Sequence, residues 1–219
     1  MFLSTLASGS AKGFGFASGP TGPTVIGQSY GGGYYAGKIN VSGTQYYLIV
    51  APKATGENSS VQWKTSNTST TGTSSVIDGP TNSSNMNNAS HPAAQFCEGL
   101  SIGGYTDWYM PAKNELEVLY YFLKPTTQNN YTTSNNGSNA NAVSPEPVST
   151  GYTTSSPAQT TVTAFQTGNS EAFTTGTYYR SSTEFDATGA WSQRFQDGLQ
   201  SNTLKSDSYY VRAVRRILV

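Results

Sequence analysis

Two helices stand out in the pattern of apolar and polar positions. Four apolar residues between Leu116 and Leu123 are spaced i, i+3, i+4 and i+7, which places them on one face of a helix. A proline suited to a first turn precedes them and a Lys-Pro pair follows, so the pattern predicts a helix over 111–123. Small and apolar residues ahead of Gly99 predict a shorter helix near 86–98.

A hairpin is predicted near the start of the chain. Aromatic and aliphatic runs at 34–39 and 46–51 flank a short connection that contains Ser42 and Gly43. Two such runs around a glycine-containing turn are typical of a β-hairpin. The second run does not alternate with polar residues, which indicates a strand that is buried on both faces.

The end of the chain is also strand-like. Runs at 178–183, 190–195 and 208–219 are separated by turn residues such as those at 187–189. We expect the last strand, Tyr209–Leu218, to pair with an N-terminal strand and close the domain. Together these elements predict an α+β fold with a small twisted antiparallel sheet, two helices and long polar loops.

Polar segments divide this arrangement. Residues 1–24 are rich in Gly, Ser and Pro and indicate an extended docking arm, which leaves 25–219 as the folded domain. Within that domain, 54–85 and 126–177 are mostly Ser, Thr, Asn and Gly, and they predict two long loops. A structureless loop of more than about 15 residues is unusual in a compact domain and tends to be functional or disordered.

Most polar residues of this chain are uncharged and carry hydroxyl or amide groups. Ser, Thr and Asn total 74 of 219 residues, whereas charged residues make up 11% and the formal net charge is zero. A neutral chain is a poor candidate for nucleic-acid binding, which depends on basic residues. No apolar run is long enough to cross a membrane, and no secretory signal is recognisable, so we expect no membrane insertion. One Cys and one His exclude a disulfide within the chain and a zinc site, and we expect no metal or cofactor.

Isolated residues give little support for catalysis. His91 precedes a proline at a helix start, where a structural or exposed histidine is the simpler interpretation. Cys97 falls on the apolar side of its helix and resembles a small buried hydrophobe. Glu184 and Asp186 lie two residues apart beside a turn, and a paired-carboxylate site for glycoside hydrolysis is conceivable there. We expect no enzyme activity.

Several separated motifs carry more information. The segment Gly103-Gly104-Tyr105-Thr106-Asp107-Trp108-Tyr109-Met110-Pro111 runs into Glu115-Leu116, and Tyr179-Arg180-Ser181-Ser182-Thr183-Glu184 and Ala190-Trp191 follow later. The chain then ends in Val211-Arg212-Ala213-Val214-Arg215. In this order the motifs resemble C-type-lectin-like domains, namely the C-terminal domains of bacterial collagen-like adhesins and many phage tail-fibre tips. The resemblance is specific over 90–219 and departs from the family pattern in Tyr179, where Trp is common, and in the long insertion 126–177.

Most of this motif is interpreted as architecture. Asp107 is expected to accept backbone hydrogen bonds, Trp108 to anchor the core, and Pro111 to start the second helix. Arg212 and Arg215 are expected to pair with Glu115, Glu117 or Glu184. The structural residues are therefore Asp107, Trp108, Pro111, Glu115, Trp191, Arg212 and Arg215.

The resemblance implies that ligands contact loops and late strands ahead of the last strand. The residues at those positions combine amide, hydroxyl and charged groups, which suit a neutral polysaccharide or an outer-membrane protein. The predicted receptor-binding residues are Ser192, Arg194, Gln196, Asp197, Gln200, Asn202, Thr203 and Lys205. The Glu-Pro-Asn and Trp-Asn-Asp signatures of calcium-dependent lectins are absent, so we expect no calcium-mediated sugar binding.

The expected function is that of a non-enzymatic phage virion protein, a fibre tip or adhesin that recognises a host surface glycan or outer-membrane protein. A structural decoration or neck/tail fibre component that serves assembly alone is the alternative. An enzyme of the formylglycine-generating type, which shares the fold, would need cysteines that this chain lacks. The arm is expected to dock on other virion proteins, and phage relatives imply a homotrimer on the particle surface.

Overall fold

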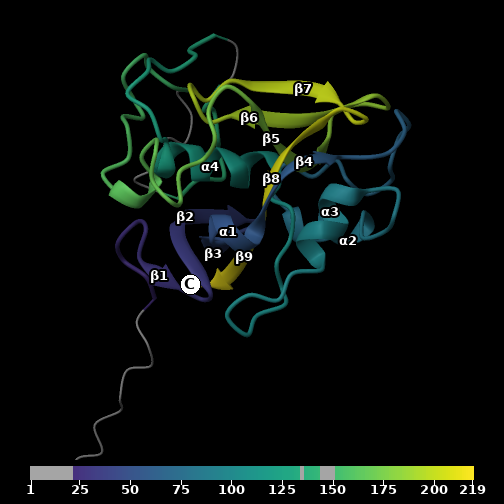
Figure 1. Cartoon of the computed structure of the whole chain (residues 1–219), viewed down its shortest axis with the longest axis horizontal. Helices are drawn as coiled ribbons and strands as arrows, with labels where there is room; N and C mark the ends of the chain where they lie inside the picture. Colours follow the sequence, from purple (N-terminus) through teal and green to yellow (C-terminus); the bar gives the residue numbers. More distant parts are fainter. Residues whose placement is uncertain (1–21, 134–135, 144–150) are drawn as a thin grey trace, which may run out of the picture.

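A computed structural model describes residues 22–133, 136–143 and 151–219, and it shows a mixed α+β domain with two sheets (Figure 1). The predicted arm at 1–24 therefore lies almost entirely outside the described residues. The strands are β1 (Ser29–Tyr30), β2 (Gly33–Val41), β3 (Thr44–Val50), β4 (Glu57–Gln62), β5 (Tyr178–Glu184), β6 (Gly189–Arg194), β7 (Gln200–Leu204), β8 (Ser208–Arg212) and β9 (Val214–Leu218). The helices are α1 (Lys53–Gly56), α2 (Gly79–Asn85), α3 (Pro92–Glu98), α4 (Lys113–Leu123) and the 3-10 turn η1 (Thr163–Phe165).

The first sheet contains the predicted hairpin. Its order is β1-β2-β3-β9, and every neighbouring pair is antiparallel. Ser42 and Gly43 form the turn between β2 and β3 with positive φ angles of 51° and 93°, the backbone that a tight two-residue hairpin requires. The last strand β9 pairs with β3, which confirms the predicted closure of the domain by its C-terminal strand.

The second sheet was not predicted as a separate sheet. Its order is β4-β8-β5-β6-β7, and β8 and β5 run parallel while the other pairs are antiparallel. The expected single strand Tyr209–Leu218 is divided at Ala213 between the two sheets. The N–H of Ala213 bonds to the carbonyl of Gly56 and its carbonyl accepts from the N–H of Ala51, so the chain crosses from one sheet to the other at this residue.

Helix α4 confirms the clearest sequence pattern. Its predicted apolar stripe from Leu116 to Leu123 is buried, and in Figure 1 the helix lies behind the strands where the two sheets meet. The other predicted helix is shorter than expected, because Pro92 begins α3 and residues 86–91 form turns.

Helix α2 and strand β4 lie within 54–85, where the sequence predicted a long loop. Helix α2 is the less expected of the two. Its sequence has no apolar stripe, and long-range hydrogen bonds replace apolar packing. Buried Asn82 donates to the carbonyl of Ser75 (2.6 Å) and to the hydroxyl of Ser182 (3.3 Å). Periodicity cannot reveal a helix of this kind, because its stability lies in partners far along the chain.

The loop 126–177 has only η1 as helix or strand within its described residues, as the sequence predicted. It is nevertheless fastened to the domain by buried asparagines. The amide oxygen of Asn130 accepts hydrogen bonds from the hydroxyl of Tyr120 (2.5 Å) and the ammonium of Lys124 (2.7 Å), and the amide of Asn139 donates to the carbonyl of Asn114 (2.9 Å). Buried amides with these partners hold the loop against α4.

Candidate functional site

Two residues of the motif, Trp108 and Asp107, have partners within the domain. Trp108 is 1% exposed, and its indole N–H donates to the carbonyl of Tyr105 (3.1 Å). Asp107 accepts two 2.8 Å hydrogen bonds from the guanidinium of Arg215. The expectation that Asp107 accepts backbone hydrogen bonds was therefore wrong, since its partner is a side chain of the last strand.

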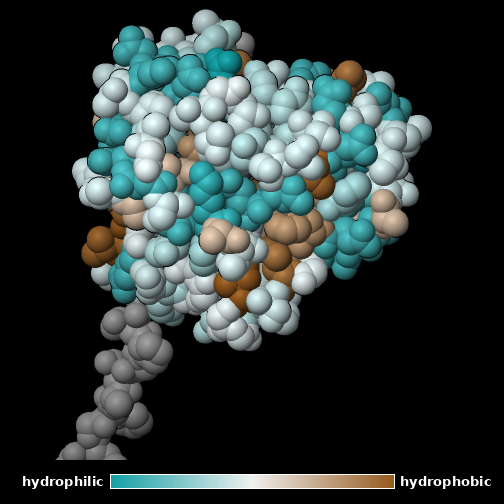
Figure 2. All heavy atoms as spheres, viewed as in Figure 1, coloured by the Kyte–Doolittle hydropathy of each residue, from teal (hydrophilic) through white to brown (hydrophobic). Residues whose placement is uncertain are grey.

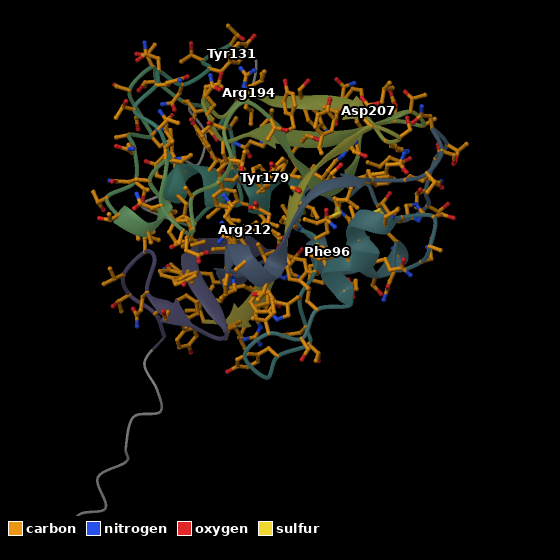
Figure 3. The ribbon with its side chains drawn as sticks, viewed as in Figure 1. Phe96, Tyr131, Tyr179, Arg194, Asp207 and Arg212 are labelled. Atoms are coloured by element: carbon orange, nitrogen blue, oxygen red, sulfur yellow. The ribbon has the colours of Figure 1, made fainter. Side chains whose placement is uncertain are left out.

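The buried arginine Arg212 has a different partner from those expected. Its guanidinium donates to the carboxylate of Glu171 (2.5 Å) and to the carbonyls of Glu171 and Ala51 (2.7 and 2.9 Å). It also lies 4.8 Å from the ring centroid of Phe173, and Figure 3 shows it near the middle of the molecule. The predicted pairing of Arg212 and Arg215 with acids at 115, 117 or 184 was wrong, because a partner from the long loop reaches the core.

Glu115, predicted to be a structural residue, is fully buried at the start of α4. Its carboxylate accepts hydrogen bonds from the hydroxyl of Tyr109 and from the N–H of Ala112, both at 2.8 Å, and it lies 3.7 Å from Arg216. Burial raises the pKa of Glu115 to about 7, against the lowering effect of Arg216.

The residues weighed for catalysis serve the fold. His91 is buried between the hydroxyl of Thr70 and the amide oxygen of Asn88, both 2.9 Å from its ring nitrogens, and burial lowers its pKa to about 4. Cys97 is fully buried, and burial raises the pKa of its thiol.

The two acids near the β5–β6 turn are engaged separately. Glu184 forms an ion pair with Lys205, and Asp186 accepts the N–H groups of Thr188 and Gly189, both at 2.7 Å. Their carboxylates therefore do not act as a free pair. Across the part of the chain that the structure describes, no group of three or more His, Cys, Asp or Glu side chains could hold a metal ion, and no helix is long and apolar enough to span a bilayer.

The eight predicted receptor-binding residues are not all at the surface. Ser192 is 2% exposed and its hydroxyl bonds to that of Thr203 (2.8 Å). Lys205 is fully buried, and its ammonium lies between Glu184 and two backbone carbonyls. Both side chains are used inside the fold, so neither can contribute to a surface, and we leave them out of the site.

The remaining six predicted residues occupy three places. Arg194 makes a two-bonded ion pair with Asp197 (2.9 and 2.5 Å), and Gln196 lies beside them in the same turn. Thr203 is half-buried and accepts from Arg180. Gln200 and Asn202, by contrast, both line a surface hollow beside β6 and β7.

This aromatic hollow has a volume of about 260 Å³. It is lined by Lys113, Asn136, Phe185, Trp191, Gln200, Ser201 and Asn202. Trp191 and Asn202 are direct cross-strand partners, so the indole and the amide share one face of the sheet. Phe185 is 48% exposed and meets Trp191 edge to face, with ring centroids 5.1 Å apart.

Polar groups around the rings are free to bind a ligand. The side-chain amides of Gln200 and Asn202 make no hydrogen bond within the described part of the chain. Asn136, in contrast, accepts the N–H of Gln200 (2.7 Å) and so fixes the long loop to β7. The ammonium of Lys113 lies 4.9 Å from the centroid of the Trp191 ring, and burial lowers the pKa of this lysine.

The chemistry of the hollow is that of a binding site. A planar indole can stack on the apolar face of a sugar ring, and amides and hydroxyls can bond to its hydroxyl groups. The face shown in Figure 2 is mainly hydrophilic or neutral, and its hydrophobic residues lie in small separate areas. Sequence reasoning missed Lys113, Asn136 and Phe185; only Phe185, a large apolar residue beside a turn, gave a recognisable signal.

The structure is thus an α+β domain whose surface carries a hollow with polar and aromatic lining. The chain matches the Lcl C-terminal domain over residues 54–215, which is most of its length, and it therefore belongs to that family. Lcl is a collagen-like protein of Legionella, and the family consists of C-terminal domains of collagen-like, adhesin-type proteins. No curated protein matches the chain.

Proposed function

We propose that this protein is a non-enzymatic adhesin domain that binds a cell-surface glycan in the aromatic hollow. The observation that carries the proposal is the aromatic pair of exposed Phe185 and half-buried Trp191 beside two amides, Gln200 and Asn202, that have no partner within the described residues. Unused amides next to an exposed phenyl ring and a half-buried indole favour a ligand with both hydroxyl groups and an apolar face.

The fold and the setting are further parts of the proposal. The C-type-lectin-like fold is supported by the motif order and by β9, which returns to the N-terminal hairpin. The assignment to a phage virion rests on the resemblance to tail-fibre tips, with an arm at 1–24 for docking and a trimer for avidity. Single polar contacts contribute only about 1 kcal/mol net, so several copies acting together would give useful affinity.

An adsorption assay tests this function. Purified protein is added to host cells, and we measure binding and competition with infection for the wild type, a Phe185→Ala/Asn202→Ala double variant and Tyr131→Ala. Tyr131 is a matched control because it is an aromatic residue with 39% exposure outside the hollow. We expect the double variant to lose binding and Tyr131→Ala to retain it.

Two other outcomes have a defined meaning. If the wild type binds no host cell but is incorporated into particles, the structural decoration is the correct function. If the double variant binds as well as the wild type, the receptor site lies elsewhere, and the turn that holds Arg194 and Asp197 becomes the next surface to test.

A further inference from the structure

A second hollow lies on another part of the molecule. It has a volume of about 400 Å³ and lies where residues of β3, β9, α2 and the end of α3 meet. Figure 3 labels Phe96 of α3, which precedes by two residues Glu98, an acidic residue that lines this hollow. The residues that matter here are Tyr46, Ser84, Glu98, Asp107, Trp108 and Arg216. None of its lining residues belongs to the aromatic hollow.

Two charged groups in this hollow are already paired. Asp107 is held by both nitrogens of the Arg215 fork at 2.8 Å. Arg216 donates to the carboxylate of Asp78 (2.8 Å), and its guanidinium lies 4.8 Å from the ring centroid of Tyr46. Each pair joins one positive and one negative side chain, so these groups add little net charge to the hollow.

Glu98 is the exception. It is the last residue of α3, it is half-buried, and it makes no ion pair with any described residue. Its carboxylate interacts with the hydroxyl of Ser83, and burial raises its pKa above the ordinary value. A carboxylate that is partly removed from water without a cation is destabilised, so this hollow has one negative charge that a cation would stabilise.

The surroundings of Glu98 determine which cations fit. The hollow is much larger than a metal ion needs, and within the described residues no set of three acidic or imidazole ligands converges there. The half-buried ring of Tyr46 lines it and offers apolar contact and π-electron density to an alkyl-substituted cation, whereas Trp108 is only 1% exposed. Charge, size and aromatic lining therefore agree on an organic cation.

We propose that this second hollow binds a primary ammonium or a guanidinium group, with Glu98 as its counter-ion and the ring of Tyr46 against its carbon chain. The group can come from an amino sugar or from a lysine or arginine side chain of a partner protein. This site shares no lining residue with the aromatic hollow, so this proposal can be correct even if the proposed adhesin function is wrong.

An NMR titration of the full chain tests the proposal. The probe is n-butylammonium, with n-butanol as the uncharged probe of similar size, and the signals are the backbone amide of Glu98 and the indole N–H of Trp108. We expect saturable shifts with n-butylammonium and none with n-butanol. Glu98→Gln keeps an acceptor for Ser83 and should weaken binding about tenfold or more. Asp207→Asn is the matched control, an exposed carboxylate without an ion pair among described residues, and it should bind as the wild type does.

Two further probes identify the source of the cation. N-acetyl-lysine amide represents a protein side chain and glucosamine represents an amino sugar, and the probe that binds more tightly identifies the ligand class. The proposal is overturned if no cationic probe shifts these signals, or if Glu98→Gln binds n-butylammonium as tightly as the wild type does. Thermal unfolding of Glu98→Gln confirms that the variant is folded before its binding is compared.

Discussion

Polar residues have opposite roles in two regions of the molecule, the core around Arg212 and the hairpin of β6 and β7. In the core, the guanidinium of Arg212 donates to the Glu171 carboxylate and to two backbone carbonyls, and that carboxylate also accepts the N–H of Lys53. On the hairpin, Gln200 and Asn202 carry amides without a partner in the described chain. Polar groups in the core stabilise the fold, whereas those on the hairpin remain available for a ligand.

The largest expected effect is the loss of the buried arginine. Arg212→Ala leaves the Glu171 carboxylate and two carbonyls without their arginine donor, and removing one partner of a buried pair costs about 3–5 kcal/mol. Arg215→Ala should cost about 1 kcal/mol, because its partner Asp107 is 55% exposed and water can replace the arginine. Urea denaturation measures both. Equal losses would show that the exposure of the partner carboxylate does not distinguish the two arginines.

A second comparison lies within the predicted receptor-binding residues. Lys205 is fully buried against Glu184 and lies 4.8 Å from the ring centroid of Trp63, whereas Arg194 is partly exposed beside Asp197. We expect Lys205→Ala to lower the free energy of unfolding by about 3 kcal/mol and Arg194→Ala by less than about 1 kcal/mol. A small loss for Lys205→Ala, measured by thermal or urea unfolding, would contradict its structural role.

These residues also show how far sequence reasoning reaches. The hairpin around Gly43 and the apolar stripe of α4 were predictable, because each depends on neighbours within a few turns. The partners of Arg212 and Lys205 were not, because Glu171 and Glu184 come together with them only through the fold. The aromatic hollow was predictable in part: Gln200 and Asn202 follow from the late strands, but Lys113 and Asn136 come from segments far away in the chain.

The protonation of Glu115 gives a pH-dependent effect of intermediate size. Its pKa is about 7 in the folded protein and 4.5 ordinarily, so between pH 4.5 and 7 the folded state keeps a proton that the unfolded state releases. The stability that this group contributes therefore falls as the pH rises through this window. In Glu115→Gln that loss is absent. Relative to the wild type, the variant should gain up to about 1.4 kcal/mol per pH unit in urea unfolding between pH 4.5 and 7.

His91 provides a control of opposite sign. Its pKa is about 4 in the folded protein and 6.5 ordinarily, so the unfolded state takes up a proton first as the pH falls from 6.5 to 4. The stability that His91 contributes is lost on acidification, and His91→Gln should remove that loss. Because Glu115 and His91 act in opposite directions, the wild type should vary less over pH 4.5–6.5 than either variant. A steeper wild-type profile would contradict one of the two assignments.

The smallest effect on stability is expected for Asn202→Ala, and it is best compared with Asn136, the other asparagine that lines the aromatic hollow. Asn136 is buried and accepts the N–H of Gln200, so Asn136→Ala should cost about 1–2 kcal/mol by leaving that donor unpaired. Asn202 is exposed on the edge strand β7 and its amide has no partner in the described chain, so Asn202→Ala should change the free energy of unfolding by less than about 0.5 kcal/mol.

Ligand binding should distinguish the asparagines in a different way. Asn202→Ala removes one hydrogen bond to the glycan, a loss of about 1 kcal/mol per site, which is about fivefold in affinity. Urea unfolding and a glycan-binding titration on the same samples separate the two effects. If Asn202→Ala reduced stability as much as Asn136→Ala, the amide of Asn202 would stabilise the fold as the polar groups of the core do. The aromatic hollow would then have a structural role and not a binding role.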